Sequence, residues 1–256
     1  MLLPLRDENP IQRFPIATVA IIGTNVLAWL LVQGLGTDIG LAHSICLYGL
    51  VPADLLGRVP EGTAYPLGEG LACVFDGASA VPNVLTSMFM HGGWLHLIGN
   101  LWFLWVFGDN VEDAMGPLRY VAFYLACGLA AAVAQVATDP GSMVPMVGAS
   151  GAIGGVMGAY ARLYPRARIE CLLVLIVFFT TISIPAIWVL GYWFAIQLAS
   201  GLPLLTGATG GGGGVAFWAH VGGFVAGVLL ARLMHQPRLL QRHRAAPPRA
   251  RARHRW

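Results

Sequence analysis

Four polar side chains stand out because each lies in an otherwise apolar stretch of the chain: Ser150, His220, His96 and Asn100. The composition, described below, indicates a membrane protein. Polar side chains inside a membrane are costly and usually functional. A serine hydroxyl becomes a nucleophile when a base takes its proton, and His220 is the candidate base. The chain contains no lysine, and arginine cannot act as a base. A serine–lysine dyad is therefore excluded, and the residues favour acyl transfer by a serine–histidine dyad.

Acyl transfer also needs hydrogen-bond donors directed at the developing oxyanion. Ser150 is expected in the first turn of a helix, where backbone N–H groups lack intrahelical partners. His96 and Asn100 are four residues apart and share one helical face, so both can add a donor. Gly148 and Gly151, which flank Ser150, are assigned to the same oxyanion and substrate region.

Each of these residues also has a structural interpretation. A serine at a helix start commonly caps or packs, an isolated intramembrane histidine is more often structural, and His96 with Asn100 could hold helices together. His91 is expected to cap or orient its loop, and an oxyanion or substrate role is the alternative. Glu112 is expected to be a structural hydrogen-bond acceptor. No metal or cofactor is expected, because the sequence has neither HExxH nor CxxC.

The composition indicates a lipid environment for the chain. Hydrophobic residues make up 57% and charged residues 11% of the chain, with a mean hydropathy of +0.69. Soluble domains carry about 25% charged residues, and a spanning helix needs about 20 apolar residues. We therefore predict an all-α, polytopic membrane protein with six transmembrane helices, at residues 16–35, 94–113, 117–137, 148–164, 171–199 and 215–233.

These spans divide the chain into a cytoplasmic segment 1–15, a membrane domain 16–235 with a long outer loop 36–90, and an Arg-rich tail 236–256 predicted to be disordered. Arginine is concentrated near both termini and in the fourth inter-helix loop, which favours cytoplasmic termini, as in a bacterial inner-membrane protein. Cys46 and Cys73 share the outer loop, and whether they pair is left open.

With this topology, the second, fourth and sixth spans all begin at the outer face. Each polar residue lies near the start of its span, so all four should reach a similar depth at about 1.5 Å of rise per residue. Small residues allow helices to pack closely in lipid. The small faces of the fourth and sixth spans should bring Ser150 against His220; their candidate packing residues are Gly154, Gly155, Gly158, Gly223 and Gly227. The glycine run at 210–214 is interpreted as a mobile cap.

Several segments resemble the rhomboid family of intramembrane serine proteases: "GASG" at 148–151, "AHVGGFVAG" at 219–227, "HGGWLHLIGN" at 91–100 and "VEDAMG" at 111–116. The resemblance covers about 45–235. It implies a six-helix fold, Ser150 as nucleophile, His220 as base, and an oxyanion pocket made by His96, Asn100 and the Ser150 backbone. In some members, an aromatic residue four positions after the serine stacks on the histidine. That position is Gly154 here, which leaves His220 with less support.

The preferred interpretation is a serine endopeptidase that cleaves transmembrane segments of membrane-protein substrates near the outer face, through an acyl-enzyme. The alternative is a catalytically inactive rhomboid-like protein that binds membrane clients. A small transporter is a third class, and the cytoplasmic halves of the spans offer little polar path for it. The lipid bilayer and membrane proteins are the expected partners, and no nucleic acid is expected.

Overall fold

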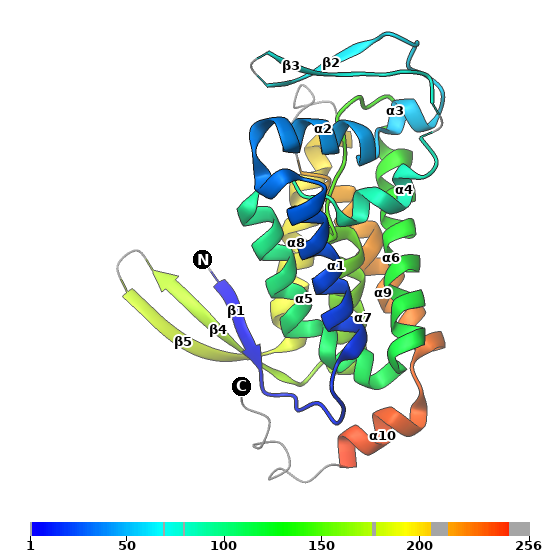
Figure 1. The fold of residues 1–256 in the computed structure, drawn as a ribbon. Coiled ribbons are helices and arrows are strands. Elements are labelled where there is room, and N and C mark those ends of the chain that lie inside the picture. The colour runs from blue at the N-terminus through cyan, green and yellow to red at the C-terminus, as the bar shows by residue number, and fades with distance from the viewer. Residues whose placement is uncertain (1, 69, 79, 176–177, 206–214, 246–256) are drawn as a thin grey trace.

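Six helices form an upright bundle in the computed structural model, which describes residues 2–68, 70–78, 80–175, 178–205 and 215–245 (Figure 1). In chain order, the bundle helices are α1 (Ile16–Leu31), α5 (Trp94–Met115), α6 (Pro117–Thr138), α7 (Ser150–Leu163), α8 (Ala186–Leu205) and α9 (Phe217–Met234). Helix α7 is buried along nearly its whole length, so the other helices surround it. Helices α5, α7 and α9 all begin at the same end of the bundle, drawn at the top of Figure 1.

Three of these helices are long and apolar enough to cross a membrane by themselves: Pro117–Thr138 of α6, Ala186–Pro203 of α8 and Phe217–Met234 of α9. Helix α1 is a shorter apolar helix. Helix α7 has only 14 residues, and α5 carries acidic residues near its lower end. Each predicted span overlaps one helix of the bundle. That six helices cross the membrane stays a prediction.

The prediction of an all-α fold is wrong for residues near the lower end of the bundle. Strands β4 (Arg168–Leu175) and β5 (Phe178–Pro185) occupy the first half of the span predicted at 171–199. Strand β1 (Leu2–Asp7) pairs antiparallel with β4, which gives a sheet of order β1-β4-β5 beside the bundle (Figure 1). This stretch is rich in β-branched and aromatic residues, and periodicity alone cannot distinguish such an apolar run from a buried helix.

Both terminal segments contain regular elements. Within segment 1–15, strand β1 is a paired strand of the sheet. The tail predicted to be disordered contains α10 (Pro237–Ala245), which starts on a proline, a favoured first helical residue. The Gln236 backbone N–H donates to the Ala114 carbonyl at 2.8 Å, which fixes α10 below α5. Residues 246–256 and the predicted cap at 210–214 lie outside the described residues.

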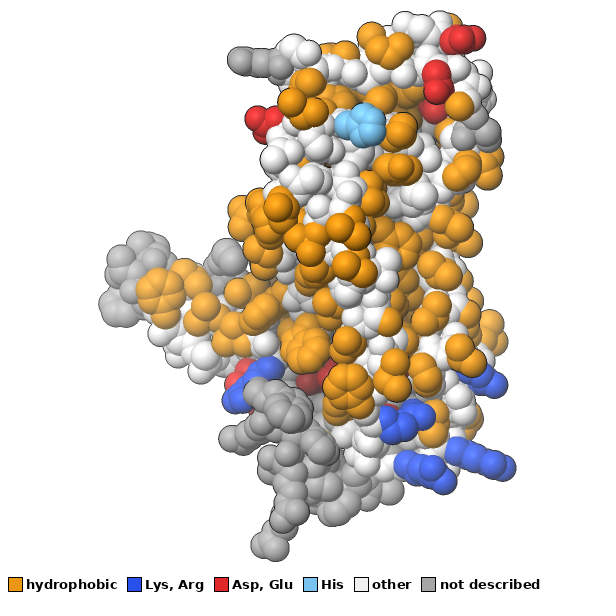
Figure 2. Space-filling view, in the orientation of Figure 1, with side chains coloured by type: hydrophobic (Ala, Val, Ile, Leu, Met, Phe, Trp, Pro, Cys, Tyr) orange, Lys and Arg blue, Asp and Glu red, His pale blue; other side chains and the backbone are white. Residues whose placement is uncertain are grey.

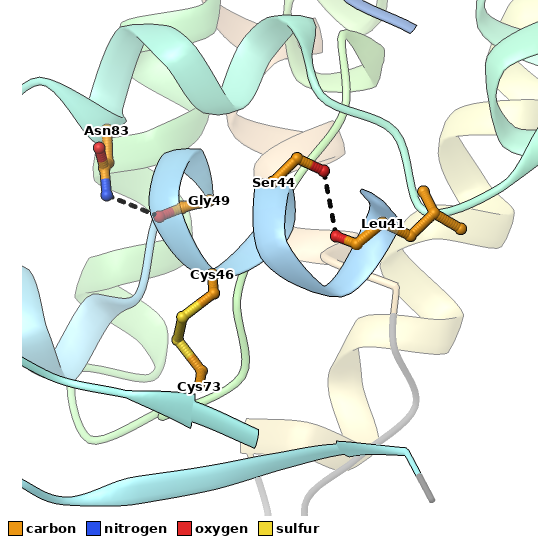
Figure 3. Close-up of a disulfide and its surroundings, with 6 residues drawn as sticks. All are labelled: Leu41, Ser44, Cys46, Gly49, Cys73 and Asn83. Atoms are coloured by element: carbon orange, nitrogen blue, oxygen red, sulfur yellow. Dashed lines mark hydrogen bonds between the residues drawn. A yellow bond between two sulfur atoms is a disulfide. The ribbon is translucent and has the colours of Figure 1, made fainter. Parts of the chain in front are cut away.

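The outer loop contains short helices, as its sequence allowed, and a β-hairpin that was not predicted. Its elements are η1 (Gly34–Gly36), α2 (Asp38–Tyr48), α3 (Pro52–Leu55), β2 (Ala64–Gly68), β3 (Leu71–Val74), α4 (Asn83–Thr86) and η2 (Ser87–Phe89). Cys46 of α2 and Cys73 of β3 form a disulfide with their Cα atoms 5.3 Å apart (Figure 3). The disulfide therefore attaches the hairpin to the helix that lies across the top of the bundle.

Glu112 fixes the lower end of α1 to α5. Its carboxylate accepts hydrogen bonds from the Ala17 N–H at 2.9 Å, the Thr18 N–H at 2.8 Å and the Thr18 hydroxyl at 2.8 Å. These donors belong to the first turn of α1, where backbone N–H groups have no partner within the helix. The prediction that Glu112 is a structural acceptor is confirmed.

The disulfide predicts how the outer loop responds to reduction. A cross-link between residues 27 apart in sequence contributes about 3.5 kcal/mol in the chain-entropy model. We expect reductant to accelerate trypsin cleavage at the exposed Arg58, which lies inside the closed loop. The double variant Cys46→Ser/Cys73→Ser should be cleaved equally fast with and without reductant. Equal cleavage rates for oxidised wild type and the double variant would contradict this prediction.

Candidate active site

The structure brings together two side chains that are 70 residues apart in sequence. His220 Nε2 lies 2.7 Å from Ser150 Oγ. Ser150 is the first residue of α7, and His220 lies in the first turn of α9. When Nδ1 of the imidazole carries the ring proton, Nε2 can accept the serine hydroxyl proton. The pair thus has the geometry of a nucleophile and its general base.

Close packing of α7 against α9 produces this contact. A Cβ atom added at Gly223 or Gly227 would overlap the carbonyl oxygen of Gly151 or Gly155, respectively. Seen from the other helix, a Cβ at Gly158 would overlap the Phe224 carbonyl. The backbones of the two helices therefore touch along a face that carries these candidate packing glycines: Gly154, Gly155, Gly158, Gly223 and Gly227.

The glycines that flank Ser150 lie in different surroundings. Gly148 has a φ of +131°, and a Cβ there would lie 2.8 Å from His96 Nε2 and 3.4 Å from Ser150 Oγ. Its N–H donates to the Ser87 carbonyl at 2.9 Å, which fixes the approach to Ser150. Gly151 lies against Ala131 of α6, where a Cβ would clash, and it also borders the cavity described below.

Two side chains of α5 can donate into the same region. The Gly92 N–H donates to His96 Nδ1 at 3.3 Å, so the neutral ring carries its proton on Nε2, the atom that faces Gly148. Asn100 is buried, and its Nδ2 has no hydrogen-bond partner among the described residues. Leaving a buried donor unsatisfied costs about 1–3 kcal/mol. Such a donor is suited to a ligand that completes the hydrogen bond.

These residues line one cavity of about 530 Å³, a size typical of small-molecule and cofactor sites. Its wall includes the six candidates named from sequence: His96, Asn100, Gly148, Ser150, Gly151 and His220. The remaining lining is mainly apolar and comes from the outer loop, all bundle helices except α1, and the residues before α7 and α9. The candidate residues thus share a single pocket.

His91 lies next to this site with a different environment. Its side chain is fully buried, and its ring makes an edge contact with His96 at a centroid distance of 5.2 Å. Burial, reinforced by the neighbouring His96, lowers the pKa of His91 to about 3, so the ring is neutral at physiological pH. The Gln33 side chain binds the His91 backbone at both N–H and carbonyl, at 2.8 and 2.7 Å. His91 is therefore placed behind the site as a packing neighbour of His96.

Two residues of α8 that sequence reasoning missed also touch His220. Gln197 Oε1 lies 2.8 Å from His220 Nδ1, and the Trp193 ring lies at a centroid distance of 5.8 Å from the imidazole. Trp193 passes close to Gly154, where an added Cβ would lie 3.6 Å from the indole. The sequence did contain a signal for Gln197, because an uncharged polar residue inside an apolar span is unusual. The support that Gly154 cannot give to His220 therefore comes from Trp193 of α8.

Among the residues that the structure describes, no group of three or more His, Cys, Asp or Glu side chains could hold a metal ion.

Comparison with known proteins identifies the class to which this fold and site belong. The Rhomboid domain model matches residues 79–237, and the chain belongs to the rhomboid family. It is a membrane protein by this membership and by its apolar helices.

Among the curated proteins, three similar relatives come from a bacterium, a fungus and a plant. The rhomboid protease GluP of Bacillus subtilis is 30% identical over 61% of this chain and 26% of its own length. Rhomboid protein 1, mitochondrial, of Saccharomyces cerevisiae is 30% identical over 57% of this chain and 40% of its own length. RHOMBOID-like protein 5 of Arabidopsis thaliana is 35% identical over 30% of this chain and 25% of its own length. The match thus spans well under two thirds of these relatives.

The glycine contact between α7 and α9 yields a prediction about stability. Gly227→Ala should lower the free energy of unfolding by about 1–3 kcal/mol, the usual cost of overpacking, because the new methyl group overlaps Gly155. Gly191→Ala is the matched control, since nothing lies within 4 Å of a Cβ at that position of α8. Thermal unfolding in detergent compares the two variants. Equal midpoints would contradict the close helix contact.

Proposed function

We propose that this protein is an intramembrane serine endopeptidase. It cleaves transmembrane segments of membrane-protein substrates near the outer face of the membrane in which it lies. The observation that carries the proposal is the 2.7 Å contact between His220 Nε2 and Ser150 Oγ inside a cavity that also presents unused donors. Family membership supports it, since GluP, one of the relatives, is named a rhomboid protease.

In the proposed reaction, the Ser150 oxygen attacks the carbonyl carbon of the scissile peptide while its proton moves to His220 Nε2. The carbonyl oxygen of the tetrahedral intermediate becomes an oxyanion. His220 then gives the proton to the leaving amine as the C–N bond breaks, which leaves an ester on Ser150. Water attacks this ester with His220 again as base, and hydrolysis releases the acid product and restores the serine.

Three donors support the oxyanion in this mechanism. The Ser150 N–H is free of an intrahelical partner because the residue begins α7. Asn100 Nδ2 is a buried donor with no partner among the described residues, and the His96 ring proton faces Gly148, beside the nucleophile. Donors arranged before reaction act more strongly in a site shielded from bulk water.

The substrate must meet the site in an extended form. A peptide carbonyl inside a regular helix is hydrogen-bonded to the N–H four residues later and is covered by side chains. The segment around the scissile bond must therefore unwind, and substrates with helix-destabilising residues near the outer face should be preferred. The apolar wall of the cavity is suited to the side chains of such a segment.

For topology, we propose that the upper end of the bundle in Figure 1 faces the outside of a bacterial inner membrane. The Cys46–Cys73 disulfide lies at that end, and disulfides persist on the oxidising side of a membrane. Basic side chains gather at the opposite end of the face drawn in Figure 2, and a broad apolar surface covers the middle. Both terminal segments, 1–15 and 236–256, are accordingly assigned to the cytoplasm and 16–235 to the membrane domain.

Covalent labelling tests the proposed chemistry directly. Purified protein in detergent should react with a fluorophosphonate probe, and mass spectrometry should locate the adduct on Ser150. Ser150→Ala and His220→Ala should abolish labelling, while Ser200→Ala on α8 should label like wild type. Folded wild-type protein that is not labelled would exclude the protease and favour the alternative function, the binding of membrane clients.

Removal of the unused donor gives a second test. Asn100→Ala should reduce the maximal cleavage rate of a tagged single-span substrate about 100- to 1000-fold, as for other oxyanion donors. The Michaelis constant should change little, because the donor acts mainly in the transition state. Thermal stability should not fall in parallel, since Nδ2 makes no hydrogen bond among the described residues. An unchanged maximal rate would remove Asn100 from the oxyanion pocket.

A further inference from the structure

We propose that Gln197 of α8 is a positioning residue that fixes the tautomer and the ring orientation of His220. The inference rests on the proposed function, because it concerns how His220 serves as the base for Ser150. Its starting point is that both ring nitrogens are engaged, Nε2 with Ser150 Oγ at 2.7 Å and Nδ1 with Gln197 Oε1 at 2.8 Å.

The chemistry of the amide selects one protonation state of the ring. An amide carbonyl oxygen can only accept a hydrogen bond, so Gln197 Oε1 requires the proton of neutral His220 to be on Nδ1. The lone pair then lies on Nε2 and points at the serine hydroxyl. The opposite amide orientation would place the lone pair on Nδ1, and His220 could not take the serine proton. The function of the base thus depends on which end of the amide faces the ring.

The uncharged amide of Gln197 is also suited to its buried position in α8. Gln197 is only 8% exposed, and it lies on a helix that is long and apolar enough to span the membrane. A carboxylate at this position would lose its hydration, which disfavours the charged form. The amide supplies the hydrogen-bond acceptor without burying a second charge. When His220 becomes an imidazolium during attack, the carbonyl dipole still favours the Nδ1 proton.

Trp193 restricts the ring from the same side. It lies four residues before Gln197, so the two side chains share one face of α8. Its ring is tilted by 39° to the imidazole, and it also packs on Phe224 at a centroid distance of 6.1 Å. The indole lies next to Gly154, where an added Cβ would be in van der Waals contact with it at 3.6 Å. Helix α8 therefore supplies both the polar and the aromatic contact of the base.

The test compares variants that remove the acceptor with a control on the same helix. Gln197→Leu and Gln197→Met keep the approximate side-chain size and remove the amide oxygen, whereas Tyr192→Phe changes a side chain that is 58% exposed. We expect both Gln197 variants to lower the second-order rate of fluorophosphonate labelling about 10- to 100-fold, part of the usual gain from general base catalysis. Tyr192→Phe should react like wild type.

A second readout separates positioning from a purely structural role. In protein labelled with ¹⁵N-histidine, the His220 signals, assigned by their loss in His220→Ala, should report a proton on Nδ1 in wild type. The Gln197 variants should shift this population toward the Nε2 tautomer. Slow labelling together with this shift supports the proposal. An unchanged tautomer overturns it, whether the labelling rate falls or not.

The two proposals fail in different ways. If wild type is not labelled at all, the proposed protease function fails, and the ¹⁵N spectra still decide whether Gln197 fixes the ring tautomer. If wild type is labelled and His220→Ala is not, but both Gln197 variants match wild type in rate and tautomer, only the positioning role is overturned. If one Gln197 variant does not fold, the other decides the outcome.

Discussion

The contact between the glycine faces of α7 and α9 is the constraint on which the candidate site depends. Gly223 and Gly227 have no room for a side chain because the carbonyl oxygens of Gly151 and Gly155 occupy that space. At this separation, the first turns of both helices bring a serine and a histidine within hydrogen-bond distance. Larger side chains at these positions would increase the distance between α7 and α9, and Ser150 and His220 would then lose their hydrogen-bond contact.

The environment of the site follows from where the helices begin. Helix starts carry unpaired backbone N–H groups, and three helices that start at one end of the bundle concentrate such donors there. The outer loop covers this end with short helices and a hairpin held by a disulfide. At the lower end of the bundle, the Glu112 carboxylate instead accepts hydrogen bonds from the first-turn N–H groups of α1. The molecule thus leaves donors unused at one end and satisfies them at the other.

The predictable part of the fold came from strong local signals. Apolar runs located a helix that overlaps each predicted span, and small residues beside Ser150 and His220 indicated which helices touch. The stretch 168–185 was assigned wrongly, because an apolar segment rich in β-branched residues has no period that separates strand from buried helix. The pairing of β1 with β4 joins residues more than 160 positions apart, and no local pattern encodes such a partner.

The sequence by itself determined the chemistry that is available: one apolar chain without lysine, a serine at a helix start, and a histidine and two donors near the starts of predicted spans. It could not determine what surrounds each group, because neighbours across a bundle depend on how every helix rotates and packs. Only the tertiary structure placed Gln197 and Trp193 on the imidazole and paired Cys46 with Cys73. Those contacts come from helix rotation and loop closure, which depend on the whole packed structure rather than on any segment alone.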